Sequence, residues 1–292
     1  MPTRHLAAAA LLVAIATSAR AADPQPPTAA DLSGARAVAL SGARGLAGGN
    51  EAIFLNAASL AARRRYSIEG QYQLDRFGSS DAGQWYTISA VDSVTGSVAG
   101  GFAYSRIASG PSIGNVGHAS IATALTSSLF VGVTGKYLSM SGADNVSAAT
   151  MDTALFARLG RLLSAGFSGY NLVDIHHPQQ APRAFGGGLA LGDDRSFHVT
   201  ADWKRDLDRK IGADGKKEAS DSWGAGLEYL VDSFPLRAGL LKDNTRDLKA
   251  WSVGAGYVST GGAAIDFTYR QSIDDPSDRT FAIALKLFIL EG

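Results

Sequence analysis

The stretch Tyr66 to Arg76, YSIEGQYQLDR, decides the fold. Apolar and polar residues alternate along it, and a β-strand places alternate side chains on opposite faces. One face would carry Tyr66, Ile68, Gly70, Tyr72 and Leu74, and the other Ser67, Glu69, Gln71, Gln73 and Asp75. The second face is too polar for a packed core, while a length of about ten residues suits a tilted strand that crosses a bilayer. The pattern predicts a transmembrane strand between lipid and a polar lumen.

Similar segments follow as far as the C-terminus, and the links between them alternate in length. Six tight links are expected near Asp92–Gly96, Thr126–Ser128, Gly160–Arg161, Gly192–Arg195, Val231–Phe234 and Ser259–Gly262. Seven longer links are expected at Phe77–Gly83, Ala108–Val116, Ser139–Ser147, Asp174–Ala181, Arg205–Ser220, Lys242–Lys249 and Ser272–Arg279. This order predicts an all-β fold: a transmembrane antiparallel up-and-down β-barrel of about 14 strands over residues 65–292, with both barrel ends on the tight-link side. A soluble β-sandwich or a pair of lipocalin-like barrels is the alternative.

Charged residues recur in the middle of the expected strands, on the face opposite the apolar one. In a membrane barrel such residues face the lumen. They are Glu69, Lys136, Asp152, Arg158, His198, Asp202, Glu228, Arg237, Asp266, Arg270 and Lys286.

The N-terminus has the pattern of an export signal. Arg4 precedes an apolar run from Leu6 to about Ala16, and Ala19-Arg20-Ala21 is the small-x-small pattern that signal peptidase recognises. Residues 1–21 are therefore expected to be a signal peptide, cleaved near Ala21, and the protein is expected in the outer membrane of a Gram-negative bacterium. No later window approaches the about 18 consecutive apolar residues of a transmembrane helix.

The amino-acid composition excludes disulfide bonds and argues against a nucleic-acid partner. Cysteine is absent, so the fold has no disulfide although export leads to an oxidising compartment. Acidic and basic residues number 27 each. A nucleic-acid-binding protein needs a strongly basic face, so no nucleic-acid partner is expected.

Residues 22–64 are expected to form a periplasmic lead followed by a small helical or irregular plug that enters the barrel from the tight-link side. The Gly- and Ala-rich stretch Gly34 to Ala62 does not alternate like a strand. A barrel of about 14 strands encloses more space than its wall side chains fill, and small residues let an inserted backbone approach the wall. Expected wall partners for its polar residues include Glu69, Asp266 and Lys286. Those polar plug residues are Arg36, Arg44, Asn50, Glu51 and Asn56. A flexible lead segment outside the barrel is the alternative.

The runs GARAVALSGA (34–43) and NEAIFLNAASLA (50–61) resemble the N-terminal region of the FadL-type and PorV/PorQ-type outer-membrane families. Those families begin with a Gly/Ala-rich element and an Asn-Pro-Ala-x-Leu motif before the first strand. Here Ala57 replaces the motif's proline, and the outer links are too short for the long lid of a FadL-type channel. The resemblance implies a barrel of about 14 strands with an internal N-terminal plug.

Other motifs point weakly to chemistry. Gly110 to Gly114 matches G-x-S-x-G but lies between two expected strands, whereas a nucleophile elbow needs a strand before it and a helix after it. His176-His177 lacks a third metal ligand at useful spacing. We expect no catalytic residue, no metal site and no cofactor, with an enzyme as the third-ranked function.

Two functions from different classes follow. The first is passive passage of small hydrophobic solutes through a plugged barrel, with outer-membrane lipid and a small hydrophobic ligand as partners. The second is a non-conducting barrel that serves as an anchor or shuttle in an envelope machine for secretion or surface motility, as PorV-type proteins do, with proteins of that machine as partners.

Overall fold

A computed structural model describes residues 28–46, 48–77, 82–109, 112–142, 145–193, 196–212 and 215–289. The expected signal peptide and its cleavage site lie outside these ranges. Four short helices come first: η1 (Ala29–Asp31), α1 (Ala35–Leu40), α2 (Ala52–Leu55) and η2 (Ala57–Ala62). The strands are β1 (Tyr66–Asp75), β2 (Gly83–Asp92), β3 (Val98–Ser109), β4 (Ser112–Ala124), β5 (Leu129–Ser141), β6 (Val146–Leu159), β7 (Leu163–Tyr170), β8 (Ala184–Gly192), β9 (Phe197–Ile211), β10 (Lys217–Val231), β11 (Phe234–Asp243), β12 (Leu248–Val258), β13 (Ala263–Ser272) and β14 (Arg279–Ile289).

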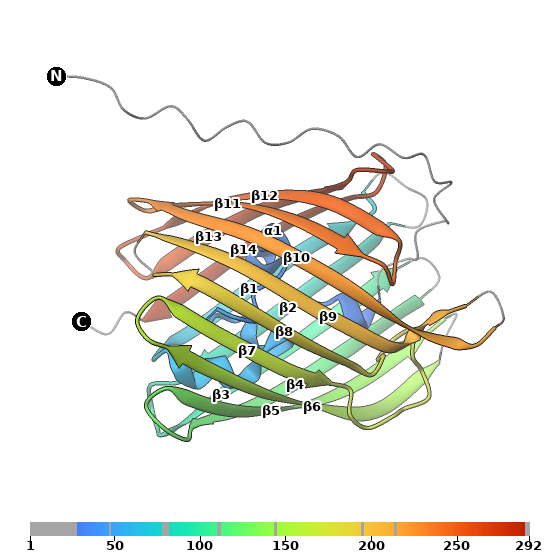
Figure 1. Ribbon diagram of the computed structural model, residues 1–292, viewed down its shortest axis with the longest axis horizontal. Helices are drawn as coiled ribbons and strands as arrows, with labels where there is room; N and C mark the ends of the chain where they lie inside the picture. Colours follow the sequence, from blue (N-terminus) through green and yellow to red (C-terminus); the bar gives the residue numbers. More distant parts are fainter. Residues whose placement is uncertain are drawn as a thin grey trace.

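The strands form one closed antiparallel barrel in which each strand pairs with its neighbours in sequence (Figure 1). Closure is made by β1, which pairs with β2 and also with β14, with Glu69 opposite Lys286. The barrel therefore has no unpaired edge strand. This confirms the predicted antiparallel barrel of fourteen strands. None of the helices in the described ranges is long and apolar enough to cross a membrane.

The two rims of the barrel need names. The proximal rim holds the start of β1 and the end of β14, and the distal rim holds the end of β1 and the start of β2. Three of the longer links expected at the distal rim, 108–116, 139–147 and 205–220, are shorter than predicted. Strand β3 runs to Ser109 and β4 begins at Ser112, and strands likewise extend into the other two ranges. Ladder pairing extends into these ranges, with Ser109 opposite Ser112, Met140 opposite Val146 and Ile211 opposite Lys217. In consequence, β9 and β10 form a hairpin that projects beyond the distal rim.

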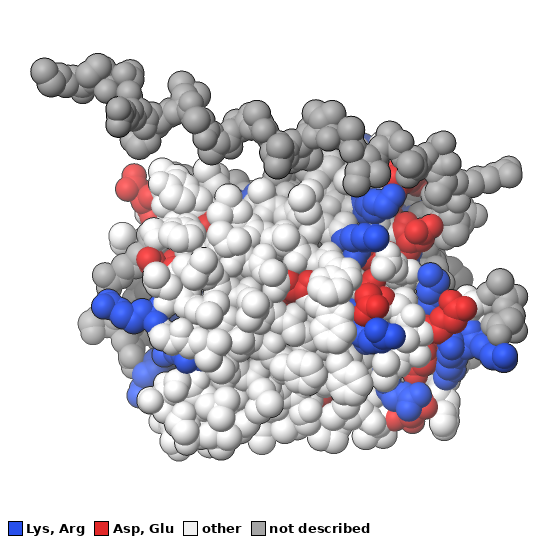
Figure 2. Space-filling view, in the orientation of Figure 1, with Lys and Arg blue, Asp and Glu red and all other residues white. Residues whose placement is uncertain are grey.

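The outer surface of the barrel is a belt of apolar side chains. Alternate residues of each strand point outward, among them Ile121, Leu285 and Leu287, each at least 60% exposed. Figure 2 shows that the middle of the visible face is largely uncharged, with most Lys, Arg, Asp and Glu near the two ends of the barrel. Water disfavours an apolar surface of this extent, whereas the hydrocarbon core of a bilayer suits it.

Candidate functional site

The inside of the barrel holds the chain segment that precedes β1. We call Thr28–Ala62, described except for Ala47, the lumenal segment. Its helix α1 packs against β10–β14, and η2 packs against β3–β6. Apolar side chains of α2 and η2, such as Ile53 and Leu60, are buried against the inner faces of β2–β4. Burial of each such side chain contributes roughly 2 kcal/mol.

The direction of the lumenal segment differs from the expected entry at the tight-link side. Asp31 bonds to Arg209, at the distal end of β9, and Ala29 bonds to Gln180 in the distal β7–β8 link. The segment ends beside β1 at the proximal rim. The chain thus runs through the lumen from the distal rim to the proximal rim. Of the expected lead, residues 22–27 lie outside the described ranges.

Wall glycines allow the lumenal segment to approach the strands closely. A Cβ on Gly224 would collide with the backbone carbonyl oxygen of Ser41, and one on Gly166 with that of Arg44. At Gly132 a Cβ would lie 2.5 Å from the backbone nitrogen of Ala58. Only glycine avoids these collisions, so the inner wall carries a track of glycines that fits the segment's backbone.

Gly224→Ala is expected to destabilise the barrel by about 1–3 kcal/mol, because the obstacle is backbone and cannot rotate away. The matched control is Gly117→Ala on β4, where a Cβ would meet nothing within 4 Å. This control is expected to change the free energy of unfolding by less than about 0.5 kcal/mol. The measurement is urea-induced unfolding in detergent micelles, and equal effects of both variants would contradict the close fit.

Arg36 of α1 is the centre of a charged network with the wall. Its guanidinium bonds to Glu228 on β10 at 2.6 Å and to Glu51 of the same segment at 3.0 Å. Glu228 also accepts from Arg237 on β11 at 2.5 Å, and Arg237 donates to Asp266 on β13 at 2.5 Å. The Glu228 side chain is 11% exposed. Charge-assisted bonds at such low exposure tie α1 to three strands at once.

The other polar residues of the segment bind elsewhere on the wall. Arg44 donates to the hydroxyl of Tyr170 at 2.7 Å and pairs with Asp202 at 3.3 Å. Asn50 lies between Ser89 and Ser67, at 3.0 and 2.7 Å, and Asn56 donates to the carbonyl oxygen of Leu155. Serine and tyrosine hydroxyls and a strand carbonyl are thus wall partners of the segment alongside the carboxylates.

The wall charges singled out from the sequence are distributed among several pairs. Glu69 pairs with Lys286 at 2.8 Å, and Lys136 pairs with Asp152 at 2.8 Å. The remaining contacts join His198 to Glu228 at 3.4 Å, Arg270 to Asp75 at 3.4 Å and Arg158 to the carbonyl oxygen of Ala62. Glu69, Asp266 and Lys286 are the expected partners of the plug's polar residues. Of these, Lys286 interacts electrostatically with Glu51 of the lumenal segment. The two arginines of the segment pair with Glu228 and Asp202, which are not among those three.

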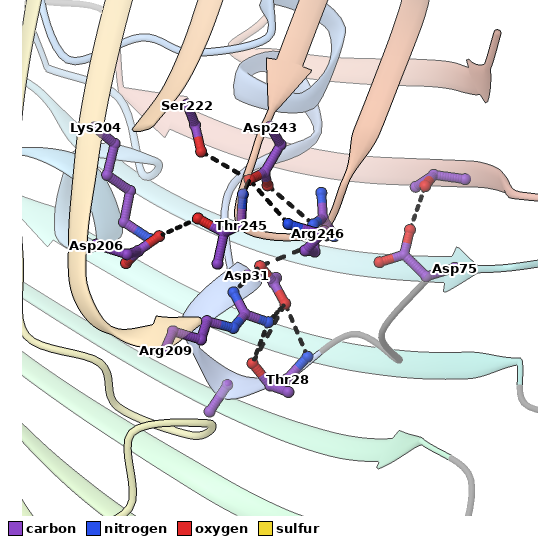
Figure 3. Close-up of polar contacts among 12 residues, drawn as sticks. Thr28, Asp31, Asp75, Lys204, Asp206, Arg209, Ser222, Asp243, Thr245 and Arg246 are labelled. Carbon is purple, nitrogen blue, oxygen red and sulfur yellow. Dashed lines mark hydrogen bonds and ion pairs between the residues drawn. The ribbon is translucent and has the colours of Figure 1, made fainter. Parts of the chain in front are cut away.

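A second cluster fixes the distal end of the segment (Figure 3). Asp31 receives hydrogen bonds from Arg209 at 2.8 and 2.9 Å and from the backbone of Thr28 at 2.9 Å, and Arg246 lies 3.9 Å away. Burial alone would raise the pKa of Asp31, but the guanidinium groups of Arg209 and Arg246 outweigh it and hold the pKa well below its usual range. The contribution of Asp31 to stability is therefore fully present above the pKa of an unfolded aspartate, about 4, and declines only at lower pH.

The lumen also has an apolar region that the sequence reasoning missed. Inner-facing side chains near the distal ends of β2–β6 are at most 6% exposed and form one cluster. Its members on the wall are Trp85, Ile107, Val116, Leu138, Met140 and Val146. A sequence signal exists, since Gln84–Ile88 carries apolar residues at both odd and even positions, with Trp85 1% and Tyr86 53% exposed.

Two cavities lie on either side of α1. The larger, about 550 Å³, opens near the proximal rim and is lined by Arg36, Arg63, Arg237 and Lys286 among others. The smaller, about 130 Å³, is lined by Ala37 and Val38 of α1 and by Asp31. Successive residues of α1 thus face different cavities, which places this helix as the partition between them.

The weaker motifs of the sequence are not assembled into a metal site in the described ranges. No group of three or more His, Cys, Asp or Glu side chains there could hold a metal ion. His176 lies in an exposed turn beside Asp174. Of the G-x-S-x-G match, Gly110 and Pro111 lie outside the described residues, and Ser112 begins β4.

Comparison with solved structures places this fold among known barrels. The toluene transporter TbuX of Ralstonia pickettii superposes with a TM-score of 0.65 at 14% identity, covering 88% of this chain and 98% of TbuX. A FadL homologue of Pseudomonas aeruginosa gives 0.62 at 11% identity, over 87% and 98% of the two chains. The fold is that of a FadL-type outer-membrane barrel.

A third FadL-like match is the toluene transporter TodX of Pseudomonas putida, with a TM-score of 0.59 at 14% identity over 90% of this chain and 98% of TodX. No protein-family model matches the sequence, and no curated protein sequence matches it. The predicted likeness to FadL-type barrels is therefore confirmed at the level of the fold. The likeness to PorV/PorQ-type proteins stays a prediction.

Proposed function

We propose that this protein resides in the outer membrane of Gram-negative bacteria and lets small hydrophobic solutes pass without expenditure of energy. Residues 1–21 would direct export and be removed near Ala21. The solved barrels of the same fold include two toluene transporters and a monoaromatic hydrocarbon channel, CymD. Because these are transporters and channels, we propose no enzymatic activity for the present chain.

The observation that carries this proposal is the apolar wall inside the distal half of the lumen. The lumen of a water-filled porin is lined by polar side chains. A buried apolar cluster that includes Trp85, Ile107 and Leu138 instead suits a lumen that admits hydrophobic solutes. Transfer of a hydrophobic solute from the outer medium to contact with such a wall is favourable, because it removes apolar surface from water. Passage then requires movement of the lumenal segment, in particular of α1, or an opening in the wall.

Uptake by intact cells tests the function. A strain from which the gene has been deleted is expected to take up radiolabelled toluene more slowly than the complemented strain, because the hydrophobic route across the outer membrane is lost. Uptake of a small hydrophilic sugar is expected to be equal in the two strains and serves as the control. Toluene uptake unchanged by the deletion would overturn the proposal, and the anchor or shuttle function would then be tested by purification of complexes from the envelope.

A further inference from the structure

The outer surface of β9–β12 carries a row of aromatic and basic side chains just below the distal rim. The pairing of the strands places four outward residues at one level: Trp203 on β9, Trp223 on β10, Lys242 on β11 and Lys249 on β12. They face away from the lumen, since Trp223 is 55% exposed whereas Asp243, the residue after Lys242, is buried. Residues at the same level of neighbouring strands lie side by side, so these four form a continuous row.

The two lysines of this row meet as like charges. Directly opposite residues on neighbouring strands have their Cβ atoms about 5 Å apart, and like charges in such positions destabilise a sheet. The Lys249 side chain is 44% exposed and pairs with Asp274 at 3.2 Å. Lys242 is exposed, and its ammonium group forms no ion pair or hydrogen bond with any of the described residues. The row therefore has a positive charge that the described part of the chain does not compensate.

A third outward cation lies one step nearer the distal rim. Arg205 on β9 lies opposite Asp221 on β10 and pairs with it at 3.4 Å. Asp221 also accepts a hydrogen bond from Trp203 Nε1 at 2.9 Å. These contacts hold an arginine and a tryptophan beside the row.

Aromatic and apolar side chains continue the same surface toward the middle of the barrel. Leu240 on β11 lies opposite Trp251 on β12, and the Trp251 ring lies 5.6 Å from that of Tyr269 on β13. Three of the four tryptophans of the chain thus belong to this surface. Tryptophan and tyrosine in membrane proteins favour the level of the lipid head groups. The lysines therefore lie at that level, with an area for acyl chains directly below them.

The distal rim is the outer one in the proposed outer-membrane location. It carries the link 171–183 between β7 and β8 and the projecting β9–β10 hairpin, and outer-membrane barrels have their longer links outside and their short turns in the periplasm. Figure 2 shows Lys and Arg gathered among acidic residues at this end of the barrel. The lipid next to the row is then that of the outer leaflet, whose head group is a phosphorylated sugar.

We propose that the outer surface formed by Trp223, Lys242, Lys249 and Trp251 binds the phosphorylated, acylated sugar of the outer leaflet, which is the lipid A part of lipopolysaccharide. One phosphate lies between the ammonium groups of the two lysines and removes their mutual repulsion, while acyl chains contact Trp251 and its neighbours. The inference rests on the proposed outer-membrane location and goes beyond the passage of solutes through the lumen.

The width of the surface selects this occupant over an ordinary phospholipid. The row spans four strands that lie about 4.8 Å apart, so it is about 14 Å wide. A glycolipid with several acyl chains covers that width, whereas a phospholipid with two chains covers only part of it. We name the four residues of the proposal the glycolipid face.

Titration of the full chain in detergent micelles with lipid A tests the proposal, with bound lipid counted by native mass spectrometry. One tightly bound molecule per chain is expected. Dephosphorylated lipid A is expected to bind at least about tenfold more weakly, because the contacts of both lysines with phosphate are lost. Phosphatidylglycerol, which keeps a phosphate but has two acyl chains and no sugar, is expected to bind about tenfold more weakly as well.

Variants assign the two contributions. Lys242→Gln with Lys249→Gln is expected to lower the affinity for lipid A by about tenfold and to leave that for dephosphorylated lipid A unchanged, so that the preference for phosphate disappears. Trp223→Ala should weaken both ligands equally. The matched control is Arg106→Gln, because Arg106 is an exposed outward cation near the distal end of β3. It should keep the full preference, and migration on a gel before and after heating checks that each variant is folded.

Equal affinities for lipid A and phosphatidylglycerol would overturn the inference, as would a preference for phosphate that survives in the double lysine variant. A loss of equal size in Arg106→Gln would show that net charge rather than the glycolipid face binds the lipid, and would overturn it too. The proposed function fails separately. Lipid A binding with toluene uptake that does not depend on the gene would keep the site and remove transport, and the reverse result would keep transport and remove the site.

Discussion

A chain from which residues 28–62 have been deleted is expected to conduct ions through planar bilayers at least about tenfold better than the intact chain, because a barrel of this strand number is wider than its wall side chains can fill. The lumenal segment occupies that space in the intact protein, with α1 on β10–β14 and η2 on β3–β6. Its removal also exposes wall charges such as Glu228 and Asp202 to water, which attracts ions into the lumen.

The conductance comparison needs proof that the shortened barrel folds. Migration on a gel before and after heating supplies it, since a folded barrel runs differently from the unfolded chain. A folded barrel with the low conductance of the intact chain would show that the segment does not obstruct the lumen.

The second large effect is expected at Glu228, the carboxylate that Arg36 and Arg237 share. Glu228→Gln is expected to lower the free energy of unfolding by about 3 kcal/mol, because it removes the carboxylate that two buried guanidinium groups share. Arg36 then keeps its ion pair with Glu51, and Arg237 keeps its ion pair with Asp266. Unfolding in urea, with the barrel in detergent micelles, measures this difference. Glu218→Gln, on the exposed part of the β9–β10 hairpin, is the matched control and should be close to neutral.

An unfolding midpoint for Glu228→Gln equal to that of Glu218→Gln would mean that the Glu228 ion pairs contribute nothing measurable to stability. The apolar contacts of α1 and its hydrogen bonds to Gln71, Ser252 and Thr268 would then hold it. The combined variant Arg36→Gln with Glu228→Gln separates the two contributions. If the pair interacts directly, the double variant should cost less than the sum of the single variants.

The strands were predictable because each one carries its own signal. In β1, the outward residues Tyr66 and Ile68 and the inward residues Ser67 and Glu69 meet different solvents, so the alternation is visible in the sequence. Strand number and neighbour pairing followed from this pattern and from the turns between strands. The ends of the strands at the distal rim did not follow, because ladder hydrogen bonds stabilise polar residues there that resemble loops.

The contacts inside the lumen depend on the register of distant strands. Arg36 meets Glu228, which is 192 positions later in the chain. Several acidic wall residues were equally good candidates for Arg36 from composition, and only the curvature of the closed barrel selects among them. The entry of the segment at the distal rim likewise depends on residues far apart in the chain. Asp31 is attracted to Arg209 and Arg246, which lie in two different links of the sequence-based prediction.

The apolar cluster at the distal ends of β2–β6 was not predicted, for a different reason. The inner face of β1 is uniformly polar and predicts a polar lumen, whereas Trp85, Ile107 and Leu138 occupy inward positions of β2, β3 and β5. A strand end that is apolar at both odd and even positions is the sequence signal for a wall that faces lipid on one side and a hydrophobic interior on the other.

The most direct measurement is a disulfide across the lumen. The Oγ atoms of Ser41, at the end of α1, and Ser252, on β12, are 3.2 Å apart, close enough for a pair of cysteines to be bridged. Ser41→Cys with Ser252→Cys is expected to form this disulfide during export and to give an oxidised form with altered migration that reductant reverses. Ser41→Cys with Ser105→Cys, on β3, is expected to form none. Absence of the first disulfide, or its formation with Ser105→Cys instead, would contradict the placement of the lumenal segment inside the barrel.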